Sequence, residues 1–195
     1  MRKKFLSLLA FVLLSLSYSV KSQKYTFTEI KTDSIKRDFK KILIVSFGSV
    51  EARSFCENLS EQLIKTLMAD SIEVEFKYLG KDAAAGNKEF KILAIQKYDA
   101  IISLVPKDSA SYWTNSNTTT TQSSNNVIGQ MPMTTRSRDV TYTQTFNIQL
   151  LEPVNQSKVL WSASLYVIFD PAKKKVYKDI TKTILSSFRK SKLIK

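Results

Sequence analysis

The sequence predicts an α/β fold with three layers, in which a mixed sheet holds a βαβαβ unit followed by an antiparallel β-hairpin and a C-terminal helix. Nearly continuous apolar runs at 42–47 and 100–105 are typical of strands buried on both faces. A segment with helical apolar spacing lies between them. Two long alternating segments, 140–150 and 159–169, predict the hairpin.

The βαβαβ unit begins with the run at 42–47. The following helix enters at Ser49, or at Ser54 through the capping-box pattern that ends at Glu57. Strict alternation over 72–78 predicts a half-exposed strand near a sheet edge. A short helix at 90–96 and the strand at 100–105 complete the unit, and we expect right-handed crossovers between its parallel strands.

The remaining elements flank this unit. Residues 23–40 are an N-terminal extension in which Tyr25 and Phe27 alternate with polar residues and predict a short edge strand. A polar turn at 152–157 joins the two strands of the hairpin. The last helix places one apolar face toward the sheet, formed by Val176, Tyr177, Ile180, Ile184 and Phe188. Residues 41–195 therefore form a single domain.

One polar segment interrupts the pattern. Residues 109–139 are poor in aliphatic side chains and rich in Ser, Thr and Asn, with low-complexity stretches inside them. Such composition is typical of segments without a packed core. We expect a flexible polar loop at about 114–138.

The first 22 residues have the layout of a secretory signal peptide. A cationic start is followed by an apolar run at 5–16 and then by small and polar residues. The run is shorter than the roughly 20 residues that span a bilayer. We expect cleavage near Ser22, with Ser19 as the alternative site and an uncleaved anchor helix as a further alternative. The mature chain is then periplasmic or secreted and has no transmembrane span.

Composition argues against most catalytic chemistry. Histidine is absent, which removes Ser-His-Asp and Cys-His catalysis and ordinary zinc sites. The single cysteine, Cys56, lies on the apolar side of the first helix, where it is expected to be a buried thiol. It is not at the cut site, so the sequence does not predict a lipoprotein. No carboxylate pair stands out, and we expect a non-catalytic protein without cofactor-binding or metal-binding residues.

The net charge of +13 is concentrated in two places. The leader holds four cations, and residues 173–195 hold nine cations against the single acid Asp179. The body between them is nearly neutral. A basic C-terminal helix on an exported protein indicates an acidic envelope protein or an anionic envelope surface as partner, and not nucleic acid. The alternative is a solvated lysine face that complements the helix dipole.

The candidate interaction surface has two parts. The first is the basic helix, with Lys182, Arg189, Lys190 and Lys192. The second is the aromatic pair that precedes the polar loop, Tyr112 and Trp113. Exposed aromatic residues dock sugars or partners. The alternative is that this pair continues the third strand and packs at its end, because Ser109 and Ser111 preserve a strand-like alternation.

A candidate ligand loop follows the first buried strand and contains Gly48, Ser49, Glu51 and Arg53. Open α/β sheets bind ligands at this position. The loop lacks the GxGxxG pattern and the P-loop lysine, so no nucleotide is indicated. The alternative is that its charges serve the helix entry. If the loop does bind a ligand, the protein is a small-ligand or glycan binder, or a hydrolase.

The element order resembles a group of bacterial envelope proteins. Segments carrying the similarity include residues 41–45, the helix 53–68, residues 98–102, and Gln149-Leu150-Leu151 leading to Lys158-x-x-Trp161-x-Ala163. The group includes the N-terminal domain of TolB, the curli-secretion lipoprotein CsgG and the penicillin-binding-protein activator LpoB. The chain departs from many members by lacking a lipobox cysteine. The resemblance implies a non-catalytic interaction or scaffold module of the cell envelope.

Overall fold

A computed structural model of the chain describes residues 25–32, 38–81, 90, 98–108, 111–120, 134–155 and 158–194. The expected signal peptide lies outside these residues, as does the expected helix at 90–96 except for Phe90. The predictions for cleavage and export therefore stay predictions.

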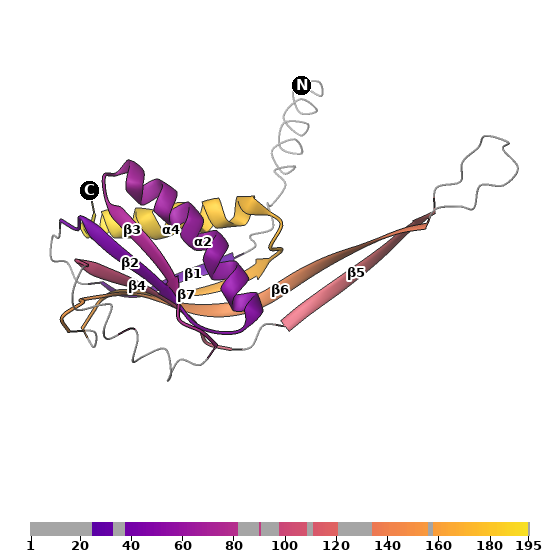
Figure 1. Cartoon of the computed structure of the whole chain (residues 1–195), viewed down its shortest axis with the longest axis horizontal. Helices are drawn as coiled ribbons and strands as arrows, with labels where there is room; N and C mark the ends of the chain where they lie inside the picture. Colours follow the sequence, from indigo (N-terminus) through magenta and orange to yellow (C-terminus); the bar gives the residue numbers. More distant parts are fainter. Residues whose placement is uncertain are drawn as a thin grey trace, which may run out of the picture.

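The described strands form one mixed sheet (Figure 1). The order across the sheet is β1 (Tyr25–Thr32), β7 (Val159–Phe169), β6 (Thr134–Leu151), β4 (Ala100–Pro106), β2 (Lys41–Ser46) and β3 (Glu73–Tyr78). β2 runs parallel to β3 and β4, whereas the β4–β6, β6–β7 and β7–β1 pairs are antiparallel. The predicted α/β class, parallel unit and C-terminal hairpin are confirmed.

Two helices cover the same face of the sheet (Figure 1). α2 (Val50–Ala69) begins after Ser49, whose side chain accepts a hydrogen bond from the Ala52 N–H, so the first of the two predicted helix starts is confirmed. α4 (Lys174–Lys190) lies beside it and runs in the same direction. The Phe55 and Tyr177 rings are 5.5 Å apart near the helix starts, and Arg189 pairs with Asp70 near their ends.

A smaller hydrophobic cluster occupies the opposite face over β2 and β4. It includes Leu43, Val45 and Phe47, and the Phe47 ring meets Phe90 edge-on at 6.5 Å. Phe90 is helical and buried, as the expected second helix requires. The two faces of the sheet are thus packed unequally, with most of the core under α2 and α4.

The polar segment at 114–138 is in part a strand pair and not a loop. β5 (Ser111–Thr120) pairs with the first half of β6 in an unbroken antiparallel register from Ser111–Thr143 to Thr120–Thr134. We call β5 and residues 134–143 the hairpin arm; it extends away from the rest of the molecule (Figure 1). The apolar pattern did not predict this strand pair, because a two-stranded ribbon is held by backbone hydrogen bonds and threonine favours strands without an apolar face. Residues 121–133 lie outside the described part.

β5 continues the path of β4 along the same edge of β6. From the pair Pro106–Phe146 to the pair Ser111–Thr143, the chain advances by five residues while β6 moves back by three. The connection between β4 and β5 is therefore two residues longer than the stretch of β6 opposite it. Asp108 holds this connection against β6 by two hydrogen bonds. Its main-chain carbonyl accepts from Gln144 Nε2 at 2.9 Å, and its carboxylate accepts from the Thr145 N–H at 3.0 Å.

Candidate functional site

The predicted ligand loop lies at the carboxyl end of β2, where α2 begins. Gly48 has a φ of +120°, and a Cβ atom at this position would lie 2.7 Å from Pro106 Cγ. The Gly48 N–H donates to Gly80 O at 3.2 Å, and the Tyr78 hydroxyl donates to Gly48 O at 2.6 Å. Glycine is required here by backbone conformation and by close packing.

The polar side chains of this loop have partners within the fold. Ser49 caps the start of α2. A hydrogen bond from its side chain to Glu51 is the main reason why the pKa of Glu51 lies below its usual value. Arg53 Nε donates to Glu57 Oε1 at 2.7 Å, and its guanidinium lies 4.9 Å from the centre of the Tyr78 ring. These contacts favour the helix-entry interpretation of Glu51 and Arg53, and ligand binding by the loop stays a prediction.

The exposed side of α4 and its end carries the predicted basic surface. We call this set the lysine face; its six members are exposed and are Lys174, Lys175, Lys178, Lys182, Lys190 and Lys192. Among the residues that the structure describes, no carboxylate lies in an ion pair with any of the six. Arg189 differs from them because it pairs with Asp70 at the end of α2. Arg189 therefore serves the packing of α2 on α4.

The aromatic pair of the predicted surface lies elsewhere. Tyr112 and Trp113 belong to β5, where their backbones pair with Tyr142 and Thr141 of β6. The pair therefore lies in a strand that follows β4 along the same edge of β6, which agrees with the strand continuation of the alternative interpretation; the packing that this interpretation expects stays a prediction. What their side chains contact lies outside the described part. The candidate surface is divided between α4 and the base of the hairpin arm.

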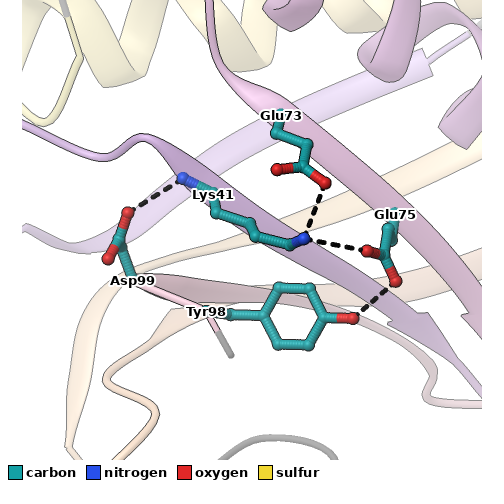
Figure 2. Close-up of polar contacts among 5 residues, drawn as sticks. All are labelled: Lys41, Glu73, Glu75, Tyr98 and Asp99. Atoms are coloured by element: carbon teal, nitrogen blue, oxygen red, sulfur yellow. Dashed lines mark hydrogen bonds and ion pairs between the residues drawn. The ribbon is translucent and has the colours of Figure 1, made fainter. Parts of the chain in front are cut away.

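A polar cluster that the sequence analysis missed joins β2, β3 and the segment before β4 (Figure 2). Lys41 Nζ lies 2.6 Å from Glu73 Oε1 and 3.1 Å from Glu75 Oε1. The Tyr98 hydroxyl donates to Glu75 Oε2 at 2.6 Å, and the Asp99 carboxylate accepts from the Lys41 N–H at 2.8 Å. We call these five residues the Lys41 cluster.

The Lys41 cluster changes the ionisation of two of its members. Hydrogen bonds to Glu73 and Glu75 raise the pKa of Lys41 above its usual value. Burial, followed by the hydrogen bond to Glu75, raises the pKa of Tyr98 to about 12. Every polar group drawn in Figure 2 has a partner among the others, so the cluster joins strand ends and offers no free acid or base.

The signal for this cluster was present in the sequence but incomplete. Glu73 and Glu75 alternate with apolar residues in the predicted strand at 72–78, which places both carboxylates on its outer face. The parallel register supplies their partner, because Lys41 lies opposite Glu73. Registers between parallel strands cannot be read from a single sequence when a long crossover joins them.

Cys56, metal-binding groups and membrane-spanning helices were considered in the part of the chain that the structure describes. Cys56 is buried, and burial raises its pKa to about 12, which matches the expected structural thiol. Within the described ranges, no group of three or more acidic or cysteine residues is arranged to hold a metal ion. The described helices include none with the length and apolar character needed to cross a membrane.

Comparisons with known proteins give similarity in solved structures alone. No protein-family model matches the sequence, and no curated protein matches it. The PelC dodecamer from Paraburkholderia phytofirmans is 16% identical, covers 83% of this chain and 95% of its own, and has a TM-score of 0.47. The lipoprotein GNA1162 from Neisseria meningitidis is 14% identical over 77% of this chain and 98% of its own, with a TM-score of 0.38.

Proposed function

We propose that this chain is a non-catalytic protein of the bacterial envelope that attaches to an anionic surface through the lysine face of α4. Its location follows from the expected signal peptide, which makes the mature chain periplasmic or secreted. Its non-catalytic character is supported by the absence of histidine and by the internal partners of the charged groups at the ligand loop and the Lys41 cluster.

The observation that carries the proposal is the lysine face itself. Its six ammonium groups lie along one exposed side, and in the described part of the chain they form no ion pairs. On the opposite side of α4, the side chains of Ile180, Ile184 and Phe188 are buried in the core. The helix is therefore held on the sheet while its lysines stay in solvent. Several like charges on one rigid element attract anionic phosphate groups, and each contributes about 1 kcal/mol near an anionic membrane.

Sedimentation with lipid vesicles tests this proposal. The mature chain should sediment with vesicles containing phosphatidylglycerol and not with pure phosphatidylcholine vesicles. Replacing Lys174, Lys178 and Lys182 by glutamate should abolish sedimentation, because the charges of the lysine face then sum to zero and its attraction to the vesicles is lost. Arg189 is left intact because its substitution would break the ion pair with Asp70.

A second triple variant controls for net charge. Lys65, Lys81 and Lys107 are exposed and lie outside α4, so their replacement by glutamate changes the total charge equally. This variant should retain most of the vesicle binding. Equal loss in both variants, or binding by neither wild type nor variants, would exclude the lysine face as the attachment site.

A further inference from the structure

The sheet face opposite α2 and α4 is open over three of its strands. Alternate residues of β7, such as Trp161 and Leu165, point into the core under the helices, so the intervening residues point to the other face. This other face is partly or fully exposed over residues 143–149 of β6, 164–168 of β7 and 26–28 of β1, whereas Ser162 and Leu151 at its end are buried. We call it the open sheet face; it includes Thr26, Thr28, Thr143, Thr145, Asn147, Gln149, Ser164, Tyr166 and Ile168.

The strand registers arrange these residues in rows. Each row crosses three neighbouring strands at directly paired positions. Neighbouring strands lie about 4.8 Å apart and successive residues on one face about 7 Å apart, so the side chains form a regular lattice. Two complete rows are uncharged, Thr26–Tyr166–Thr145 and Thr28–Ser164–Asn147, and a third, Lys31–Ser162–Gln149, ends in a lysine at the rim of the face.

The open sheet face is uncharged. Residues 141–151 and 159–169 contain no Asp, Glu, Lys or Arg, although 24% of the whole chain is charged. Charged residues begin at its rims, where Lys31 lies opposite Ser162 and Lys107 follows β4. A surface without charge offers no attraction to phosphate-rich membranes or to acidic proteins.

The side chains of the two uncharged rows carry hydroxyl and amide groups that can form hydrogen bonds. In the described part of the chain, no side-chain group of the two rows forms a hydrogen bond with another protein group. Tyr166 is 43% exposed and Ile168 is 37% exposed, so an aromatic and an aliphatic side chain lie beside the hydroxyl and amide groups. Neutral donors and acceptors next to an exposed ring match the hydroxyl groups and C–H faces of sugars.

We propose that the open sheet face binds an uncharged polysaccharide. A polymer fits better than a single sugar because the lattice repeats across three strands and is not confined to one position. Tyr166 stacks on one sugar ring, and the Thr, Ser and Asn side chains of the two rows exchange hydrogen bonds with hydroxyl groups of the neighbouring rings. This site is independent of the lysine face, which lies on the other side of the sheet.

Depletion by insoluble polymers tests this proposal on the mature chain. Cellulose, curdlan and chitin serve as neutral polymers, and phosphocellulose serves as the anionic comparator. At about 1 M salt the Debye length is about 3 Å, so binding through the lysine face is suppressed while neutral contacts persist. We expect at least one neutral polymer to deplete the protein at this salt concentration.

Two variants locate the binding. Tyr166→Ala should raise the dissociation constant about tenfold, and Ser164→Lys, which adds a charge within the second row, should do at least as much. Met68→Ala is the matched control, because Met68 is an exposed apolar side chain on α2, and it should bind as wild type does. Thermal melting of each variant confirms that it is folded.

Three results would overturn the proposal: depletion by phosphocellulose only, no depletion by any neutral polymer, or depletion unchanged in both open-face variants. Sedimentation velocity adds a fourth. If wild type self-associates and Tyr166→Ala does not, the open sheet face is an interface between copies of this chain. The lysine-face variant should keep polysaccharide binding, so failure of one proposal is distinguishable from failure of the other.

Discussion

The ionisation of single residues is perturbed where strand ends are joined. Tyr98 lies beside Lys41 and donates to Glu75, and burial with that hydrogen bond raises its pKa to about 12. The cause is packing against the second hydrophobic cluster, which disfavours the phenolate. The ionisation of this tyrosine is therefore linked to folding.

This linkage predicts alkaline destabilisation. The folded-state pKa of Tyr98 exceeds the unfolded value of about 10, so its contribution is complete below pH 10 and is lost as the pH rises from about 10 to about 12. Tyr98→Phe should flatten the fall of the unfolding free energy across this range. Urea titrations at pH 8 to 12 measure it. Burial also raises the Tyr177 pKa, so some slope should remain in the variant. An identical slope in wild type and Tyr98→Phe would show that Tyr98 is not responsible.

At the scale of elements, the docking of α4 depends on a buried polar chain as well as on apolar packing. Trp161 Nε1 donates to Ser187 Oγ at 2.9 Å, and the Ser187 hydroxyl donates to Glu29. These contacts join β7, α4 and β1. The Trp161 ring also packs edge-on against Phe188 at 4.8 Å, so it is fixed from two sides.

Removing the middle of this chain should be costly. Ser187→Ala leaves the buried Trp161 N–H without an acceptor, and the expected loss is about 1–3 kcal/mol of unfolding free energy. Ser186→Ala is the control, since Ser186 is exposed on the same helix, and it should change stability by less than about 0.5 kcal/mol. Urea denaturation followed by tryptophan fluorescence compares them; equal stability of the two variants would contradict the prediction.

The elements that the sequence predicted well are those with an apolar pattern. The runs at 42–47 and 100–105, the alternation at 72–78 and the stripe of α2 all gave the observed elements, because burial imposed their periodicity. Residues 114–120 and 134–138 of the hairpin arm were predicted as a loop because threonine-rich strands in a ribbon leave no apolar period. The Lys41 cluster was missed for another reason: it depends on which strands are neighbours, and that is set by the whole sheet.

At the scale of the whole molecule, the hairpin arm is separate from the domain it leaves. Among the described strands β5 pairs with β6 alone, and the paired strands extend away from the rest of the sheet (Figure 1). Two-stranded ribbons contribute little stability of their own in water. The body of the molecule should therefore fold without the arm.

Shortening the arm tests this independence. Replacing residues 115–139 by Asn-Gly, a pair that favours two-residue hairpin turns, retains the Thr114–Val140 pair. The unfolding free energy should change by less than about 1 kcal/mol, and unfolding should stay cooperative. Differential scanning calorimetry measures both. A broad or strongly lowered transition would show that the arm stabilises the domain.

The position of β1 has a consequence for the order in which the chain folds. β1 pairs only with β7 among the described strands, and Tyr25 also bonds the Asp179 carbonyl and the Thr183 hydroxyl of α4, 154 and 158 residues away. β1 therefore leaves the ribosome long before β7 and α4 have been synthesised. Such long-range closure is slow, because the loop entropy is lost before the contacts form. The native sheet can be completed only after β7 has been synthesised, so the edge of the sheet that β1 covers stays open until nearly the whole chain exists.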